Sequence, residues 1–498
     1  MDTTLHSLLR DALDRFGDRP AIRVDDRQMS YADLVAAANH LARTLVDLGV
    51  KPGEPVALMM SNRLEWLIAD QAIIRAGAAK VPINVMLSEP EMSFILRDCG
   101  ARIALADEPM ASTARATCLE AVLVPGQPGW DTDPTIAAHA GPPDVTVSGT
   151  DTALILYTGG TTGRQKGVVH NQAGLALNLL AHVVEVGFQD DECLLLNTPL
   201  PHSAGFLAQA GLLKGARVGI ATRFDAEQTL RLIERDAVTF LFLVPTMIYR
   251  LLDAGEDVDV DVSSLRTILY GAAPITPERL AAGLKRFGPV FMQLYGQSEA
   301  PNFLTRLTRE DHDPDRPDRL QSCGRAAAMV HLRILDDDGS PLPAGAAGEV
   351  CARAPYVMAG YHGLPEKTAA TVRDGWLHTG DIGALDDYGY LRLLDRKNDM
   401  IISGGMNVYT TEVENVLGTC TGVEQVAVVG VPHPDWGEAV VAFVVPGDDF
   451  DADSAALRCR SELASYKRPK AYEQVAAIPT TPIGKIDKKA LRAGWTRW

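Results

Sequence analysis

Glycine, threonine and basic residues are concentrated at 157–170, in the stretch YTGGTTGRQKGVVH. Glycines lack a Cβ, so a backbone rich in them can approach a ligand closely and point its N–H groups at it. Threonine hydroxyls add donors, and Arg164 and Lys166 add positive charge. Such groups suit a polyphosphate, although a turn of this composition needs no ligand. The residues expected at the phosphates are Thr158, Gly159, Gly160, Thr161, Thr162 and Gly163.

Several better-known motifs do not fit this chain. A Walker A loop needs Gly-Lys-Ser/Thr, whereas Gly167 follows Lys166. The hydrolase elbow G-x-S-x-G ends in glycine, whereas Ala300 stands there, so a nucleophile at Ser298 is disfavoured. No G-x-G-x-x-G lies at a strand–helix junction, and histidines and cysteines lack metal-ligand spacing. Any metal is therefore expected to be Mg²⁺ that arrives with a nucleotide.

Five further segments accompany the glycine-rich stretch, and together they cover nearly the whole chain. With that stretch they resemble, in order and spacing, the motifs of the adenylate-forming superfamily of acyl-CoA synthetases, peptide-synthetase adenylation domains and luciferases. The resemblance is closest to AMP-forming aryl- or medium-chain acyl-CoA ligases. The segments are GAAP at 271–274, YGQSEA at 295–300, WLHTGD at 376–381, DRKNDMIISGGMNVYTTEVE at 395–414 and TTPIGKIDKKAL at 480–491.

The resemblance implies that a carboxylate attacks the α-phosphorus of ATP, and that the thiol of coenzyme A (CoA) then takes the acyl group and releases AMP. Lys485 would bridge the substrate carboxylate and the α-phosphate, and Glu299, with Thr162, would hold Mg²⁺. Asp381 and Arg396 would bind the ribose; a hairpin ion pair is the alternative. The implied ATP and AMP contacts are Thr158, Gly159, Gly160, Thr161, Thr162, Gly163, Lys166, Gly271, Ala272, Ala273, Gln293, Tyr295, Gly296, Ser298, Asp381 and Arg396.

The second half-reaction implies a mobile C-terminal part. In the superfamily this part turns, removes the lysine and presents the segment that Ser403, Gly404 and Gly405 form here. Paired glycines leave room for a pantetheine arm, although a plain turn would also use them. Asn398 stands at the hinge, where the family usually has Asp or Lys, so the resemblance does not predict the rate at which the C-terminal domain rotates.

The acid would lie near His202, which aligns with the residue that gates the carboxylate pocket in the family. With Lys485 and Glu299, His202 completes the implied catalytic set. The alternative is a histidine that only caps a turn. The segment at 202–204 offers no anion for an amino-acid substrate, so an aryl or medium-chain acid is expected. Two alternative functions stay open: an enzyme that loads the acid onto a carrier protein, and a catalytically idle nucleotide-binding protein. The implied acyl pocket comprises His202, Phe206, Met247, Gly271, Gly296 and Asn302.

Around these motifs, the sequence alternates between short apolar strands and longer helices. Strands are predicted at 56–60, 79–84, 153–157, 218–221, 239–244 and 266–271, and helices at 5–16 and 62–78. The predicted fold is α/β. It has a large N-terminal domain, 1–395, of helix-covered and mostly parallel sheets plus a small barrel-like region, and a small mobile α+β domain, 396–498. Within the latter, helices are expected after Thr411 and from Ser454.

Composition sets the remaining limits. The 498 residues carry 47 basic and 64 acidic side chains, a net charge of −17, which disfavours nucleic acid or an anionic membrane as partner. No run is apolar enough to span a membrane, and no signal peptide is recognisable. Seven scattered cysteines suit reduced, buried thiols, so the cytoplasm is the expected compartment. Whether the chain forms a homodimer stays open.

Overall fold

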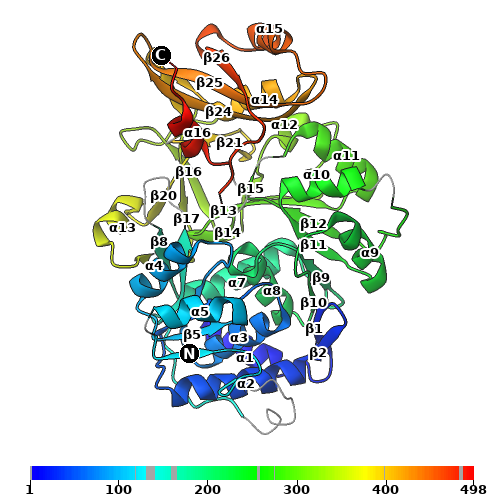
Figure 1. Cartoon of the computed structure of the whole chain (residues 1–498), viewed down its shortest axis with the longest axis vertical. Coiled ribbons are helices and arrows are strands. Elements are labelled where there is room, and N and C mark those ends of the chain that lie inside the picture. Colours follow the sequence, from blue (N-terminus) through cyan, green and yellow to red (C-terminus); the bar gives the residue numbers. More distant parts are fainter. Residues whose placement is uncertain are drawn as a thin grey trace. The chain divides into compact units, whose positions relative to one another are not determined.

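The computed structural model describes residues 3–117, 119–130, 141–158, 165–254, 258–273, 275–397, 399–481 and 486–497 (Figure 1). The chain divides into two compact units, Met1–His331 with Ala352–Leu377, and Leu332–Cys351 with His378–Trp498. Helix-covered sheets in the first unit and a smaller α+β second unit confirm the predicted fold class. The boundary at 395/396 concerns a moving part and stays a prediction.

A nine-stranded sheet in the first unit has the order β15-β14-β13-β12-β11-β9-β10-β1-β2. Strands β13, β12, β11, β9, β10 and β1 run parallel. The central strands are apolar and fully buried, as strands covered on both faces should be. The bounds are β1 Pro20–Val24, β2 Arg27–Ser30, β9 Cys193–Leu196, β10 Arg217–Ile220, β11 Phe240–Leu243, β12 Thr267–Tyr270, β13 Phe291–Gln297, β14 Ala300–Leu307 and β15 Arg325–Ala326.

A seven-stranded sheet in the same unit has the order β18-β8-β7-β4-β3-β5-β6. Strands β7, β4, β3, β5 and β6 run parallel, and β8 returns antiparallel to β7. The bounds are β3 Pro55–Met59, β4 Ala79–Pro82, β5 Ile103–Ala106, β6 Ala121–Leu123, β7 Thr152–Thr158, β8 Lys166–Asn171 and β18 Gly360–Tyr361. All six strands predicted from apolar runs are therefore confirmed, five of them to within about one residue at each end.

Helices connect these strands. The first helix buries one apolar stripe, as its spacing predicts, whereas α3 is buried along its whole length. Leu230 of α9, Ile248 of α10 and Leu280 of α11 join one core with β11 and β12. The bounds are α1 Leu5–Leu13, α2 Tyr31–Asp47, α3 Leu64–Arg75, α4 Glu89–Cys99, α5 Glu108–Ala116, α7 Gln172–Val186, α8 Gly205–Leu213, α9 Ala226–Asp236, α10 Pro245–Ala254, α11 Pro277–Phe287, α12 Pro317–Leu320 and α13 Pro365–Thr371.

The second unit contains most of two antiparallel-rich sheets. The division between the units falls within β16, β17 and β20, and β19 lies in the first unit. The helices predicted after Thr411 and from Ser454 are present, and they begin one and two residues earlier, at Thr410 and Ala452. The bounds are β16 His331–Leu335, β17 Gly348–Arg353, β19 Val372–Arg373, β20 Trp376–Leu385, β21 Leu391–Arg396, β22 Ile401–Ser403, β23 Met406–Val408, β24 Val423–His433, β25 Gly437–Pro446, β26 Ala471–Gln474, α14 Thr410–Gly418, α15 Ala452–Glu462 and α16 Lys488–Gly494.

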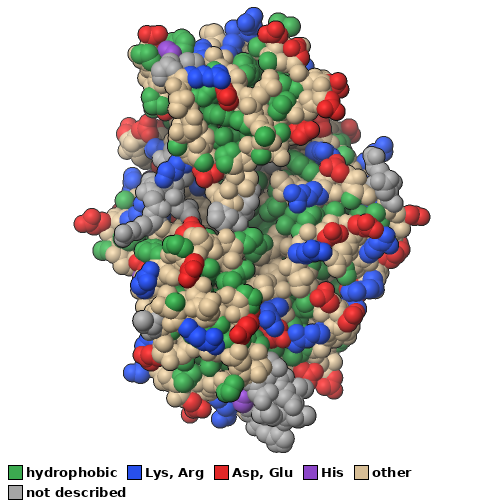
Figure 2. Space-filling model, in the orientation of Figure 1, with side chains coloured by type: hydrophobic (Ala, Val, Ile, Leu, Met, Phe, Trp, Pro, Cys, Tyr) green, Lys and Arg blue, Asp and Glu red, His purple; other side chains and the backbone are tan. Residues whose placement is uncertain are grey.

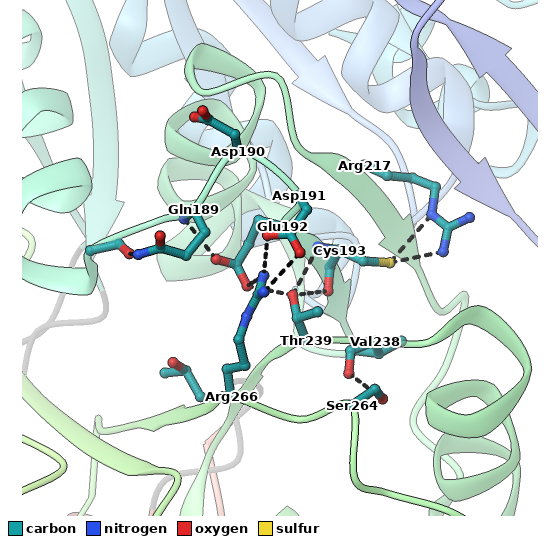
Figure 3. Close-up of polar contacts among 12 residues, drawn as sticks. Gln189, Asp190, Asp191, Glu192, Cys193, Arg217, Val238, Thr239, Ser264 and Arg266 are labelled. Atoms are coloured by element: carbon teal, nitrogen blue, oxygen red, sulfur yellow. Dashed lines mark hydrogen bonds and ion pairs between the residues drawn. The ribbon is translucent and has the colours of Figure 1, made fainter.

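The amino ends of β9, β11 and β12 carry a polar network (Figure 3). The buried Glu192 carboxylate accepts hydrogen bonds from the Thr239 hydroxyl, from the Arg266 guanidinium at 3.1 Å and from the Gln189 N–H at 2.9 Å. Arg266 also pairs with Asp191 at 2.9 Å. This amino-end network binds three strand starts together and lies at the ends opposite to those that lead into the predicted motifs.

The thiols and the surface agree with the expectations from composition. The six described cysteines are free thiols, and all but Cys420 are buried. Burial raises the pKa of Cys193, beside which the Arg217 guanidinium lies at 3.1 Å from the sulfur. Acidic and basic side chains are intermingled over the face that Figure 2 shows. In the part of the chain that is described, no helix combines the length and apolarity needed to cross a membrane.

Candidate active site

The predicted phosphate-binding stretch connects β7 to β8. Thr158, the last residue of β7, pairs with Lys166, the first residue of β8. The glycines and threonines between them, Gly159, Gly160, Thr161, Thr162 and Gly163, lie outside the described residues, as does Arg164. The structure therefore fixes the two ends of the stretch and leaves the phosphate contacts themselves as predictions.

Glu299 is held by one residue of β18 and by one residue of the segment that precedes β18. The Tyr361 hydroxyl donates a 2.6 Å hydrogen bond to Oε1 of Glu299, and the Met358 N–H donates to its carbonyl at 2.8 Å. The Lys166 ammonium lies 4.8 Å from the centroid of the Tyr361 ring. Burial lowers the pKa of Lys166, and so does the nearby Lys367, while Glu299 acts in the opposite direction. A predicted metal ligand and a predicted phosphate contact thus share one tyrosine.

Ser298, the other polar residue of the turn between β13 and β14, is held through its backbone. The buried imidazole of His170, on β8, donates from Nε2 to the Ser298 carbonyl at 2.8 Å. Burial lowers the pKa of His170 to about 4, so this imidazole stays neutral at physiological pH. The two sheets are therefore joined at the position where the predicted phosphate and metal contacts lie.

The predicted adenine-facing turn follows β12 directly. Gly271 is buried, whereas Ala272 and Ala273 are exposed, and Ala272 has a φ of +68°. Positive φ in an alanine is uncommon and indicates local backbone strain. On the neighbouring β13, Oε1 of Gln293 is buried without a hydrogen-bond partner among the described residues. An unpaired buried acceptor of this kind suits a ligand that carries an amino group.

The residues predicted for the acyl pocket occupy different environments. Asn302, with a φ of +65°, donates from Nδ2 to Nε2 of the buried His182 at 2.8 Å, and Phe206 stacks on the same imidazole at 5.9 Å. Gly296 lies against the backbone of Asn302. Met247 instead packs against the core of α9, α10 and α11. His202 lies in an irregular turn, Leu200–Ala204, within hydrogen-bond distance of Asn84.

In the second unit, Asp381 and Arg396 face each other across the β20–β21 hairpin. They are register partners, and Nε of Arg396 lies 3.2 Å from Oδ1 of Asp381. The carboxylate is buried, whereas the guanidinium is about half exposed. The ion pair that the sequence offers as an alternative is thus present. It also holds an anionic acceptor beside a donor, which is what binding of a sugar diol requires.

Ser403, Gly404 and Gly405 form the tip of the β22–β23 hairpin. Gly404 and Gly405 have φ values of +59° and +80°, so their two-residue turn needs glycine at both positions. The Gly404 N–H donates to the Trp436 carbonyl at 2.9 Å, and the Lys470 ammonium lies 4.8 Å from the centroid of the Trp436 ring. The turn that paired glycines also allow is present, and the role of this hairpin as a CoA passage stays a prediction.

Lys485 and Asn398 lie outside the described residues, but their neighbours are ordered into contacts. Thr480 and Ile486 form an antiparallel bridge on either side of the lysine segment. Arg492 of α16 pairs with Asp399 at 2.9 Å, so the helix that follows Lys485 is tied to the residue that follows Asn398. The catalytic role of Lys485 and the hinge role of Asn398 both stay predictions.

Tyr361, His170 and Asn84 are residues that sequence reasoning missed. No motif gives any of these three residues a functional role. Each nevertheless contacts a predicted site residue that is distant in sequence. The signal that could have found Tyr361 is weak, because one tyrosine after a glycine is typical of many strand starts. Only the tertiary contacts identify these residues as supports of the site.

Comparisons with known proteins identify the family of the chain. Residues 9–362 match the family described as AMP-binding enzyme, and residues 412–485 match the AMP-binding enzyme C-terminal domain. The chain is 34% identical to the medium/long-chain-fatty-acid–CoA ligase FadD8 of Mycobacterium tuberculosis, over 98% of this chain and 89% of that protein. It is 38% identical to a feruloyl-CoA synthase of an Amycolatopsis species, over 95% of each.

A solved structure gives the same result for the fold. The amide bond synthetase McbA from Marinactinospora thermotolerans superposes with a TM-score of 0.90 at 33% identity, covering 99% of this chain and 100% of that one. The chain therefore belongs to the AMP-binding enzyme family within the adenylate-forming superfamily, and it is an enzyme of the acid–thiol ligase class.

Proposed function

We propose that this enzyme activates an aryl or medium-chain carboxylic acid with ATP and transfers the acyl group to CoA. The carboxylate would attack the α-phosphorus and displace pyrophosphate, and the CoA thiol would then displace AMP from the acyl-adenylate. The observation that carries the proposal is the Lys166–Tyr361–Glu299 arrangement, because it holds a cation and a carboxylate beside the two ends of a glycine- and threonine-rich stretch.

The first step brings two anions together, so the site must offset charge as well as orient groups. Lys166 and the N–H groups of the glycine-rich stretch would bind the β- and γ-phosphates, and Ser298 the α-phosphate. Lys485 would neutralise the charge that moves between carboxylate and α-phosphate. Gln293 fits the adenine amino group through its buried oxygen, and Asp381 with Arg396 fits the ribose.

Mg²⁺ would enter with the nucleotide and polarise the phosphates. Glu299 fits this ion, because a carboxylate offers about four acceptor positions, of which the Tyr361 hydrogen bond occupies one. Mg²⁺ in nucleotide sites commonly takes one or two carboxylates and completes its shell with phosphate and water oxygens. Thr162 is retained as a proposed second ligand from the sequence.

For the acceptor half, we infer that the Ser403–Gly405 hairpin faces the pantetheine arm after the part from residue 396 onward has turned. The neighbouring Trp436 and Lys470 would offer an aromatic face and a cation to the rest of CoA. For the acid, the Phe206–His182 stack and the lack of an anion at 202–204 favour a neutral aryl or alkyl group.

The test is acid-dependent pyrophosphate release, measured with and without CoA across benzoates, hydroxycinnamates and C4–C12 fatty acids. We expect one acid class to support release, CoA to accelerate it with formation of AMP, and Lys485→Ala to lower adenylation by about 10²- to 10³-fold. Absence of release with every acid, together with measurable ATP binding, would instead support an idle nucleotide-binding protein.

A second acceptor is the alternative that a specific observation supports. The superposable McbA is an amide bond synthetase, so an amine as well as a carrier-protein thiol is a candidate acceptor. Acyl-adenylate that forms normally but does not respond to CoA would favour these acceptors. Parallel assays with a phosphopantetheinylated carrier protein and with simple amines would then separate the two.

A further inference from the structure

Two asparagines at the carboxyl ends of neighbouring strands bind the segment that carries His202. Asn62 follows β3, accepts the Leu200 N–H on Oδ1 at 3.0 Å and donates to the Thr198 carbonyl at 3.0 Å. Asn84 follows β4, and its Nδ2 lies 3.2 Å from Nε2 of His202. One asparagine therefore fixes the backbone of the segment, and the other contacts its imidazole.

The orientation of the Asn84 amide is determined by a second contact. The Met86 N–H donates to Oδ1 of Asn84 at 3.0 Å, so the oxygen must face Met86 and the NH₂ group must face His202. The side chain is buried, with about 4% of its surface exposed, which leaves little freedom to exchange the two ends. The group that Asn84 presents to His202 is therefore a hydrogen-bond donor.

A donor at this position selects one form of the imidazole. Nε2 of His202 must accept the hydrogen bond, so it carries no proton, and the proton of the neutral ring lies on Nδ1. An imidazolium would point an Nε2–H group at the amide NH₂, which is unfavourable. The backbone of His202, with φ −112° and ψ −145°, interrupts the turn around it, so the ring is aimed by contacts and not by a regular helix.

We propose that Asn84 is a positioning residue which, through the Nδ2–H to Nε2 contact, holds His202 in the Nδ1–H form and in one orientation beside the acid. This inference rests on the proposed role of His202 at the carboxylate pocket. It also assigns a reason for a buried asparagine after β4, where an apolar residue would pack without any need for a partner. Loss of the contact removes the donor that keeps Nε2 of His202 unprotonated.

The first experiment reads the imidazole directly and needs no substrate. The full-length protein, labelled with ¹⁵N at its 11 histidines, is examined by long-range ¹H–¹⁵N correlation, and His202→Phe identifies the His202 signals. We expect a pyrrole-type Nδ1 and a pyridine-type Nε2. In Asn84→Asp, an isosteric carboxylate can only accept, so Nε2 should become protonated. A protonated Nε2 in the parent protein, or an unchanged Nε2 in Asn84→Asp, would overturn the proposal.

The second experiment is kinetic. Asn84→Ala should raise KM for the acid about tenfold, as expected for one lost hydrogen bond, with KM for ATP changed by less than about twofold. In a His202→Phe background the same substitution should change KM for the acid no further, because its effect passes through the imidazole. Additive effects in the double variant, or an equal rise in both KM values, would contradict positioning.

Asn197→Ala is the matched control. Asn197 is an equally buried asparagine, directly after β9, whose amide donates to the Thr229 hydroxyl at 3.0 Å. It should lower stability without moving the His202 signals or KM for the acid. Should no acid be adenylated by the parent enzyme, the proposed function fails, whereas the nitrogen signals still decide whether Asn84 sets the state of His202.

Discussion

The two ends of the parallel strands in the nine-stranded sheet are built differently. At the amino ends, Glu192, Thr239 and Arg266 bind one another, and Asp191 closes the network at the surface (Figure 3). At the carboxyl ends of β9 and β13, the predicted site residues are held by partners outside this sheet. His202 contacts Asn84, and Glu299 contacts Tyr361.

Backbone geometry follows the same division. Five described residues other than glycine have positive φ, and three of them have ordinary local reasons, because Asp25 and Asp374 lie in hairpin turns and Ala237 caps α9. The other two, Ala272 and Asn302, follow β12 and interrupt the start of β14. Strained conformations persist where the surrounding structure enforces them, which is common at functional sites. One end of the strands thus carries contacts within the sheet, and the other end holds the residues that are predicted to carry the chemistry.

The largest effect expected from this division is on catalysis. Glu299→Gln keeps the size of the side chain but removes the charge that would hold Mg²⁺, so adenylation should fall about 10²- to 10³-fold. The free energy of unfolding should change by less than about 1 kcal/mol, because Tyr361 can still donate to the amide oxygen. Pyrophosphate release and urea unfolding, measured on the same preparation, check both parts. A large loss of stability would show that Glu299 is structural.

The opposite result is expected at the amino ends. Glu192→Ala leaves one face of Arg266 without its buried acceptor and the Thr239 hydroxyl with only the Cys193 carbonyl at 3.3 Å. It should lower the free energy of unfolding by about 3 kcal/mol. KM and kcat at 20–25 °C should stay within about twofold of the parent values. The control is Glu227→Ala, which removes an exposed pair with Arg231 and should cost less than about 0.5 kcal/mol.

A smaller effect is expected where a partner outside the nine-stranded sheet orients a site residue. Tyr361→Phe removes the 2.6 Å hydrogen bond to Glu299 while keeping the ring beneath Lys166. The Mg²⁺ concentration that gives half-maximal adenylation should rise about tenfold, the lower end of the effect of orienting partners on metal ligands. Binding of Mn²⁺–ATP, followed by electron paramagnetic resonance, gives a readout besides turnover. An unchanged affinity for Mn²⁺–ATP would show that Tyr361 does not orient the metal ligand.

The mildest test concerns acid stability. Burial lowers the pKa of His182 to about 4, below its value near 6.5 in the unfolded chain, so the unfolded state binds more protons between these values. The contribution of His182 to the free energy of unfolding is fully present above about pH 6.5. It is lost as the pH falls towards 4, at about 1 kcal/mol per pH unit. His182→Gln should lower the slope of the free energy of unfolding against pH, measured by urea unfolding, by about 1 kcal/mol per pH unit. An unchanged slope would show that His182 titrates normally.

Prediction from sequence succeeded where the signal is local. The strands at 153–157, 239–244 and 266–271 are recognisable because a strand covered on both faces must be apolar throughout. The motif at 295–300 was found because its residues are adjacent in the chain. The supports were not found, since Tyr361 lies 62 positions from Glu299 and Asn84 lies 118 positions from His202. No local pattern specifies such pairs.

By itself, the sequence determined the family, the fold class, the order of elements and the residue types available for adenylation, because periodicity and contiguous motifs are properties of neighbouring residues. Only the tertiary structure decided which side chains hold those residues: Tyr361 on Glu299, His170 on Ser298 and Asn84 on His202. The physical reason is that a hydrogen bond depends on distance in space to within a few tenths of an ångström. That distance is set by how two separately formed sheets pack, which no single segment encodes.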